Sequence, residues 1–358
     1  MGQGYYDPKI SVIVPMFKCE DYIEECLRSL QQQSLPDFEA ICVDDGSPDN
    51  SLARAKACVA DDDRFSFIEF EQNKGLSAAR NAAMRQARGE YLVFLDSDDY
   101  FVPDALEKIY TRASVQNLDD LYFSAQSFYD SYEAHQLVQE DYSKRLPFND
   151  VANGKELFVF FQHAHQFFPQ AAFHAVKRSF IEETGINFYE GILHEDVLFS
   201  YRVITASERS SFLNEPLYMR RIREGSIMTE PKRTLKNVNG LFISMMEMKA
   251  WLYAHAEELD IEFVQAITGS MTEFFLIIAH DWFTDISEED RASYLAGLEP
   301  QQRIVFFEDV VARGSAVAAV KEEYLESITY RVGDTILKAP RVVKDQIGSA
   351  LRYRKDKA

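Results

Sequence analysis

The chain has 358 residues, of which 46% are hydrophobic and 27% charged, and this composition is typical of a globular protein with a full core. Its formal net charge of −20 at pH 7 argues against nucleic acid as a partner, which would need a basic face. Four cysteines without a CxxC pair, no signal peptide and no bilayer-length apolar run favour a cytoplasmic protein with reduced thiols.

The first half of the chain alternates between strand and helix patterns. Buried strands are expected at 9–15, 38–45, 65–70 and 91–95, and helices at 20–33, 51–60, 75–89 and 103–116. Repeated strand–helix units with apolar strands predict an α/β fold, with a mostly parallel sheet and helices on both faces. In such a sheet, ligands bind beyond the carboxyl ends of the strands.

The second half of the chain has a weaker pattern. Residues 126–153 are polar and aromatic, which predicts a loop or insertion. A helix is expected from residue 154, a short strand at 171–176, a helix at 194–206 and a strand pair at 210–222. After about residue 232 the pattern is largely helical.

The last residues, 338–358, form a basic tail with seven basic and two acidic side chains, a net charge of +5. Its apolar residues recur at helical spacing. Basic amphipathic helices lie on anionic bilayers, so one hypothesis is peripheral membrane contact. The alternatives are a solvated helix, or one that docks on the acidic body of the chain or on a second subunit.

Three carboxylates stand close together in "EYLVFLDSDDYFVP", residues 90–103. An apolar strand stops at Asp96, and Asp98 and Asp99 follow; such carboxylates repel one another unless a positive group joins them. Mg²⁺ and Mn²⁺ often bind through one or two carboxylates together with substrate phosphates. On an extended loop, Asp96 and Asp98 would point the same way and address one ligand. Asp99 is equally compatible with a helix cap.

Other polar or aromatic side chains also follow strand patterns. Asp44 and Asp45 close the second expected strand, where a carboxylate can accept hydrogen bonds from a ligand's ring N–H or ribose hydroxyl. Phe17 follows the first strand and could stack on a base, or could be a core or loop aromatic. Arg80, on the helix after Gly75, could bind a phosphate or could position an aspartate in a structural ion pair.

Two further groups of charged residues have both a chemical and a structural interpretation. Glu195 and Asp196 open a helix, where acids favour the helix dipole or could provide a general base. Arg221 and Arg223 would share one face of a strand, with Arg220 on the other. These arginines could reach a diphosphate or an anionic acceptor, or form a solvated basic strand.

In order, "SVIVPMFK", "VDDGSPDNS", "NKGLSAARNAAM", "GEYLVFLDSDD" and "HEDVLFSYR" resemble the signature of family 2 glycosyltransferases with the GT-A fold. The resemblance covers about residues 9 to 225. It implies a GT-A (Rossmann-like) domain at 1–230, with a nucleotide-sugar half at about 1–125 and an acceptor half at about 126–230. Residues 231–358 would form a mostly helical C-terminal region.

The resemblance implies transfer of a sugar from a nucleotide diphosphate sugar, with UDP favoured, to a hydroxyl of a glycan or lipid-linked acceptor with inversion. Such enzymes build surface polysaccharides or glycolipids, which places the protein in the cytoplasm or at the inner face of the membrane. By this resemblance, Phe17 and Asp45 match positions that hold the nucleotide's base, with Pro15 and Asp44 beside them. Asp96 and Asp98 match the motif that binds ribose and a Mg²⁺ or Mn²⁺ ion. Asp196 matches the general base that takes the acceptor's proton, with Glu195 next to it. Arg80 and Arg221 are added as nucleotide-sugar contacts, and a homodimer is a further hypothesis.

One position departs from the family pattern, because Lys18 stands where an asparagine is common. A competing hypothesis keeps the fold without catalysis and makes the chain a nucleotide-sugar-binding subunit that regulates or scaffolds a partner. The two hypotheses differ in what they require of Asp196. A dinucleotide dehydrogenase is disfavoured because no GxGxxG follows the first strand.

Overall fold

The computed structural model describes residues 8–137, 142–223 and 233–312, and these contain a mixed sheet of eight strands. From one edge to the other the strands are β3 (Phe65–Glu69), β2 (Phe38–Asp44), β1 (Ile10–Met16), β4 (Tyr91–Phe94), β7 (His174–Lys177), β6 (Asp120–Tyr129), β8 (Ser210–Ile222) and β5 (Tyr100–Phe101). The basic tail at 338–358 lies outside the described residues, so the hypotheses about it stay open.

The first four strands, β1 to β4, are parallel to one another, as the strand–helix pattern predicts. The helices between and after them are α1 (Ile23–Gln31), α2 (Ser51–Cys58), α3 (Leu76–Gln86) and α4 (Ala105–Val115). Met16 pairs with Asp44 at the carboxyl ends of β1 and β2. Polar residues that follow these two strands therefore start from the same edge of the sheet.

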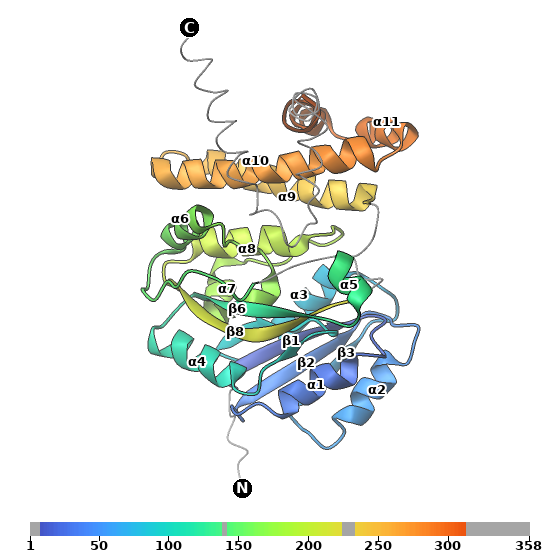
Figure 1. Cartoon of the computed structure of the whole chain (residues 1–358), viewed down its shortest axis with the longest axis vertical. Helices are drawn as coiled ribbons and strands as arrows, with labels where there is room; N and C mark the ends of the chain where they lie inside the picture. Colours follow the sequence, from blue (N-terminus) through green and yellow to red (C-terminus); the bar gives the residue numbers. More distant parts are fainter. Residues whose placement is uncertain (1–7, 138–141, 224–232, 313–358) are drawn as a thin grey trace.

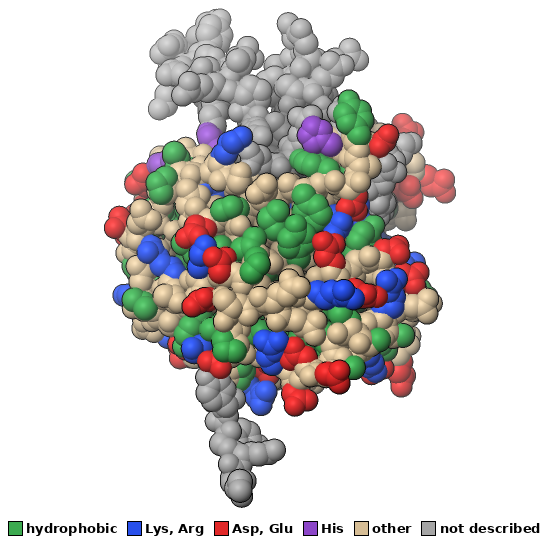
Figure 2. Space-filling model, turned by 60° about the horizontal axis from the view of Figure 1, so that its bottom comes forward, with side chains coloured by type: hydrophobic (Ala, Val, Ile, Leu, Met, Phe, Trp, Pro, Cys, Tyr) green, Lys and Arg blue, Asp and Glu red, His purple; other side chains and the backbone are tan. Residues whose placement is uncertain are grey.

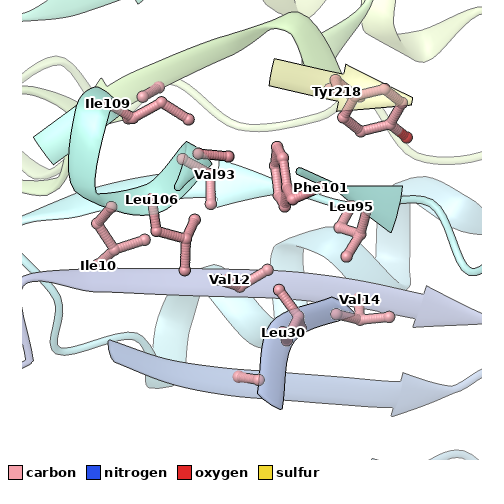
Figure 3. Packing of buried hydrophobic residues seen from close by; sticks show 14 of the residues in the cluster. Ile10, Val12, Val14, Leu30, Val93, Leu95, Phe101, Leu106, Ile109 and Tyr218 are labelled. Carbon is pink, nitrogen blue, oxygen red and sulfur yellow. The ribbon is translucent and has the colours of Figure 1, made fainter. Parts of the chain in front are cut away.

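Helices cover both faces of the sheet, because successive residues of β1 point to opposite sides. Val12 and Val14 pack in a core with Leu30 of α1 and Leu106 of α4 (Figure 3). Ile13 instead packs in a second core with residues of α3, of α7 (Arg178–Thr184) and of α8 (Glu195–Ala206). The prediction of helices on both faces is confirmed.

Two strands run against the others: β7 is antiparallel to β4 and β6, and β5 is antiparallel to β8. The other six strands share one direction, so the sheet is mixed but mostly parallel, as the sequence predicts. The loop expected at 126–153 is wrong in its first part, since β6 continues to Tyr129 and α5 (Tyr132–Leu137) follows. Pairing with β8 extends β6, a long-range contact that local periodicity does not encode.

The strand pair expected at 210–222 is a single strand, β8. Its register against β6 shifts twice, between Phe123 and Ala125, opposite the segment that contains Pro216. Proline lacks the N–H of a regular ladder and is found at such irregularities. The turn-like "NEP" sequence therefore produces a bulge in one strand rather than a hairpin.

A helical layer lies on the side of α6 and α8 away from the sheet (Figure 1). The layer consists of α9 (Leu235–Ala254), α10 (Ile261–Thr284), α11 (Glu288–Gly297), α12 (Pro300–Val305) and the π-helical η2 (Phe306–Ala312). The remaining helices are α6 (Gly154–Ala164) and the short η1 (Ala171–Phe173), which precedes β7. Leu198 of α8, Leu241 of α9 and Phe274 of α10 belong to one buried cluster. The hydrophobic core thus continues across the expected domain boundary near residue 230.

One described helix, α10, is long and apolar enough to cross a membrane by length and composition, with a mean hydropathy of 1.4 over its most apolar stretch. The expectation from the sequence that no such stretch exists is therefore corrected. In the structure, 44% of that stretch is buried, and it packs against α6 and α9. A core helix of a soluble protein meets the same criterion, so the finding is weak evidence for a membrane span.

The surface carries acidic and basic side chains interspersed with one another, as the face in Figure 2 shows. Pairs such as Lys56 with Glu69, 2.6 Å apart, and Arg54 with Glu24, 2.9 Å apart, bring opposite charges together. Exposed pairs of this kind contribute little to stability.

A fully buried histidine connects three elements of the second half. His174 Nδ1 lies 2.8 Å from Asp120 Oδ1, and its Nε2 lies 3.4 Å from Ser200 Oγ. Serine, histidine and aspartate in this order resemble a hydrolase triad. All three side chains are inaccessible, so no substrate reaches the hydroxyl, and the contacts tie β6, β7 and α8 together instead.

We predict that His174→Phe lowers the free energy of unfolding by about 3–5 kcal/mol, because it leaves the buried Asp120 carboxyl group without its partner. Urea unfolding followed by circular dichroism measures the loss. The matched control is His163→Phe, since His163 is 66% exposed and 4.0 Å from Glu262. Its expected change is below about 1 kcal/mol, and equal losses in the two variants would contradict the structural role.

Candidate functional site

A cleft of about 570 Å³ brings together residues from both halves of the chain and from the helical layer. Its walls come from the start of α3, the loop after β4, the segment around η1, the loop before α8, the strand β8 and the first turns of α9. The charged residues that line it are Lys74, Arg80, Asp96, Asp99, Glu195, Asp196, Arg220 and Lys236. The fold therefore gathers Arg80, Asp96, Glu195 and Asp196 in one place, as the sequence motifs predict.

The three aspartates after β4 stand on a turn rather than on an extended loop. The Asp99 N–H donates to the Asp96 carbonyl at 3.0 Å. The side chains therefore do not alternate as they would on an extended loop, and the carboxylates of Asp96 and Asp98 have different partners. Asp96 Oδ1 accepts from Arg80 Nη2 at 2.8 Å, and Asp98 Oδ2 accepts from Arg223 Nε at 2.9 Å. Asp98 is not among the residues that line the cleft, and its joint action with Asp96 on one ligand stays a prediction.

Arg221 binds the same turn through its backbone and its guanidinium. Its backbone N–H donates to Asp99 Oδ1 at 2.6 Å, and its Nε donates to the Asp98 carbonyl at 2.9 Å. Its two terminal nitrogens contact the carboxylates of Glu25 and Asp130. The guanidinium is thus engaged by protein groups and does not line the cleft, and its role in nucleotide-sugar binding stays a prediction.

Arg80 is the buried cation that links the two sequence motifs. Its Nη1 donates to Glu195 Oε1 and its Nη2 to Asp96 Oδ1, each at 2.8 Å, and its side chain is only 4% exposed. The guanidinium also lies over the ring of Phe188, 5.1 Å from the centroid. This is the geometry of the structural alternative, in which Arg80 positions acids, while direct contact with a nucleotide sugar stays a prediction.

The two acids at the start of α8 have raised pKa values. Burial and, next, the charge of Glu195 raise the pKa of Asp196 to about 7, against the opposing effect of Arg80. Burial likewise raises the pKa of Glu195, with Arg80 again opposing. A carboxyl group that titrates near neutral pH in a cleft is suited to accept a proton. Asp196 lines the cleft, as a general base requires.

The residues predicted to hold the base lie together at the carboxyl ends of β1 and β2. Phe17 follows the buried Pro15 and Met16, and 41% of its surface is exposed. Asp44 is buried; its Oδ2 accepts from the Ser47 N–H at 3.3 Å, whereas its Oδ1 is buried without a hydrogen-bond partner. Neither residue is among those that line the cleft, and their contact with a nucleotide's base stays a prediction.

Asp45 has a structural task beside any contact with a base. Its carboxylate accepts the backbone N–H groups of Lys74 at 2.6 Å and of Gly75 at 2.9 Å. Gly75 has a φ of 92°, a conformation that glycine adopts without a steric penalty. Asp45 therefore holds the turn from which α3, and with it Arg80, begins.

Tyr218 is a site residue that the sequence did not indicate. It is fully buried on β8, and its hydroxyl donates to Asp99 Oδ2 at 2.6 Å and accepts the Asp96 N–H at 3.2 Å. Its ring packs on Phe101 at 5.4 Å between centroids (Figure 3). The contacts bridge more than a hundred residues of sequence, so no local pattern could have shown them.

Three further cleft residues come from β8 and α9. Arg220 lies on the opposite face of β8 from Arg221, as alternation predicts, and it contacts Tyr142. Lys236 and Asn239 enter the cleft from α9 and were not expected there. Of these three residues, the sequence predicted only the orientation of Arg220, from the alternation of side chains along a strand.

The described residues contain no group of three His, Cys, Asp or Glu side chains preassembled for a metal ion. Mg²⁺ or Mn²⁺ needs only one or two carboxylates when phosphates supply the other oxygens. Asp96 fits that role, because its side chain is 39% exposed at the cleft and Arg80 engages only one oxygen. Asp98 would share its carboxylate with Arg223.

The model of the family described as Glycosyl transferase family 2 matches residues 11–182, just under half of the chain. A relative among curated proteins is the uncharacterized glycosyltransferase EpsJ of Bacillus subtilis, 33% identical over 230 residues. The match covers 63% of this chain and 64% of EpsJ, so the chain spans less than two thirds of that relative. The resemblance drawn from the five motifs is confirmed.

Two solved structures share the fold. S. aureus TarS 1-349 in complex with UDP-GlcNAc gives a TM-score of 0.60 at 22% identity, covering 86% of this chain and 83% of TarS 1-349. The mannosyltransferase PcManGT from Pyrobaculum calidifontis, in complex with GDP-Man and Mn²⁺, gives a TM-score of 0.51 at 17% identity, covering 91% and 84%. At such identities the likeness shows the fold alone, and it confirms the GT-A expectation.

Proposed function

We propose that the chain is an inverting glycosyltransferase that moves a sugar from a nucleotide diphosphate sugar to a hydroxyl of a glycan or lipid-linked acceptor. The observation that supports this most directly is Asp196, a carboxyl group with a pKa near 7 in the cleft that also contains Asp96. The family match and the nucleotide sugars named for TarS and PcManGT point the same way. A UDP-sugar donor and a cytoplasmic place in polysaccharide synthesis are part of the proposal.

On the donor side, Phe17 and Asp45 would hold the nucleotide's base with Pro15 and Asp44 beside them, and Asp96 with Asp98 would hold ribose and a Mg²⁺ or Mn²⁺ ion. The ion, when bound, stabilises the charge that develops on the nucleoside diphosphate as it leaves. The arginines around the acid turn keep it from repelling the substrate phosphates, since Arg80 and Arg223 each neutralise one carboxylate.

On the acceptor side, Asp196 would take the proton of the attacking hydroxyl as the new glycosidic bond forms. Its raised pKa matches the proton-accepting task near neutral pH. Glu195 is committed to Arg80, so it would orient the start of α8 rather than reach the acceptor. One base without an enzyme nucleophile gives a single displacement, and a single displacement inverts the anomeric centre.

The competing proposal is a nucleotide-sugar-binding subunit without turnover. A thermal-shift screen of nucleotide diphosphates and UDP-sugars, with and without Mn²⁺, comes first, because a ligand that binds the native state raises its stability. Binding is common to both proposals, so turnover must separate them.

We predict that Asp196→Asn lowers kcat by about 10²–10⁴-fold, because an amide cannot accept the acceptor's proton. The donor dissociation constant should stay unchanged, since Asp196 is assigned no donor contact. UDP release from the donor that the screen identifies measures kcat, and calorimetry measures binding. The control is Asp104→Asn on the surface of α4, which should keep full activity. Full transfer by Asp196→Asn would favour the binding subunit.

The pH dependence of kcat/KM gives a second prediction. A general base works only when deprotonated, so kcat/KM should rise with pH and level off above about 7. Glu195→Gln removes the neighbouring negative charge that raises the pKa of Asp196, and the midpoint should move to lower pH. Initial rates measured across the neutral range test both points. A midpoint that stays in place in the variant would mean that Asp196 does not control the acid limb.

A further inference from the structure

Helix α9 packs unusually close to the loop that precedes the proposed base. A Cβ atom placed on Gly240 would lie 2.0 Å from the carbonyl oxygen of Leu193, whereas ordinary contacts of this kind begin at 3.4 Å. The atom it would meet belongs to the backbone, so no side chain can rotate away. Gly240 therefore allows the helix to touch the loop three residues before Asp196.

A second contact braces the next residue of this loop. His194 has a φ of 62°, in the left-handed region that non-glycine residues seldom adopt. The buried Asn237 of α9 brings its Nδ2 to 3.3 Å from His194 Nε2. The Oδ1 of the same side chain accepts the Thr234 N–H at 2.9 Å and so caps the start of α9. The helix thus holds a strained residue immediately before Glu195.

The contact between the two helices continues into the core. Val197 and Leu198 of α8 share one buried cluster with Val238 and Leu241 of α9. The family match ends at residue 182, so this bracing lies outside the part of the chain that the family model describes. The catalytic end of α8 is supported by an element with no counterpart in that match.

We infer that α9 is an obligatory part of the active site, in which Gly240 and Asn237 are positioning residues that fix the loop carrying Asp196. The part of this inference that treats Asp196 as the general base rests on the proposed glycosyltransferase function. The same docking brings Lys236 and Asn239 into the wall of the cleft. The C-terminal helical region therefore shapes the site directly, beyond adding stability to the domain.

The expected effect of disturbing this contact is large on rate and small on nucleotide binding. A methyl group on Gly240 must displace α9 or the Leu193 carbonyl by more than 1 Å to restore an ordinary contact. A misplacement of about 1 Å far from the chemistry can cost roughly 10²-fold in rate. The residues assigned to the nucleotide's base lie at the carboxyl ends of β1 and β2, and α9 contributes none of them, so they should be unaffected.

The test compares Gly240→Ala with Gly269→Ala in the full chain. Gly269 lies on α10, where an added Cβ meets nothing within 4 Å, so it controls for the change of helix propensity. We expect Gly240→Ala to lower kcat for UDP release from UDP-GlcNAc by about 10–100-fold. The dissociation constant of UDP with Mn²⁺, measured by calorimetry, should remain that of the wild type. Gly269→Ala should match the wild type in both.

Asn237→Asp is the second variant, in case Gly240→Ala does not fold. It keeps an oxygen that caps α9 but replaces the amide donor that faces His194. We expect a lower kcat with unchanged UDP affinity, whereas a purely structural residue would change stability alone. If Gly240→Ala folds, a wild-type kcat in both variants overturns the inference. If it does not fold, a wild-type kcat in Asn237→Asp alone overturns it.

Hydrogen exchange measured by mass spectrometry provides a readout that does not depend on turnover. Amides of residues 191–198 should exchange faster in Gly240→Ala than in the wild type and in Gly269→Ala. Absence of turnover in the wild type with every donor would count against the proposed function, and the exchange rates would still decide the positioning role. Unchanged exchange at 191–198 in a folded Gly240→Ala would refute it.

Discussion

The rest of the site depends on one buried charge, the guanidinium of Arg80. Burying an unpaired cation is costly, and its loss from solvent is compensated only if acids surround it with good geometry. Arg80 obtains two such acids, Asp96 and Glu195, each at 2.8 Å. These residues come from three elements, so the ion-paired cluster can form only when α3, the turn after β4 and the start of α8 are in their native places.

The same cluster explains the chemistry that we propose. Arg80 engages Glu195, and the neighbouring Asp196 remains at the cleft with a pKa near 7 because burial and Glu195 outweigh the arginine. The carboxylate of Asp96 is half-accessible and can meet a cation or a ribose hydroxyl. One guanidinium therefore joins the donor-side acid Asp96 to Glu195, the residue next to the proposed base. Helix α9 closes the arrangement by bracing the loop before α8.

Much of this could be read from the sequence, because it depends on local patterns. Apolar strands ended by polar residues located the edge of the sheet, and the motifs located Asp96 and Asp196. The contacts that the sequence missed are long-range. Tyr218 reaches the acid turn only through the register of β8, and Gly240 matters only because Leu193 lies beside it. Because Asp96 to Asp99 form a turn, their side chains do not alternate as the sequence analysis assumed, and Asp98 pairs with Arg223.

The most direct test of the account is a double-mutant cycle between Arg80 and Glu195, measured as free energies of unfolding in urea. Arg80→Met alone should cost about 3–5 kcal/mol, because Glu195 is left buried without its cation. In the Glu195→Gln background the same substitution should cost much less, with a coupling free energy of about 1–3 kcal/mol. Costs that add within about 0.5 kcal/mol would show that Arg80 does not hold the site together.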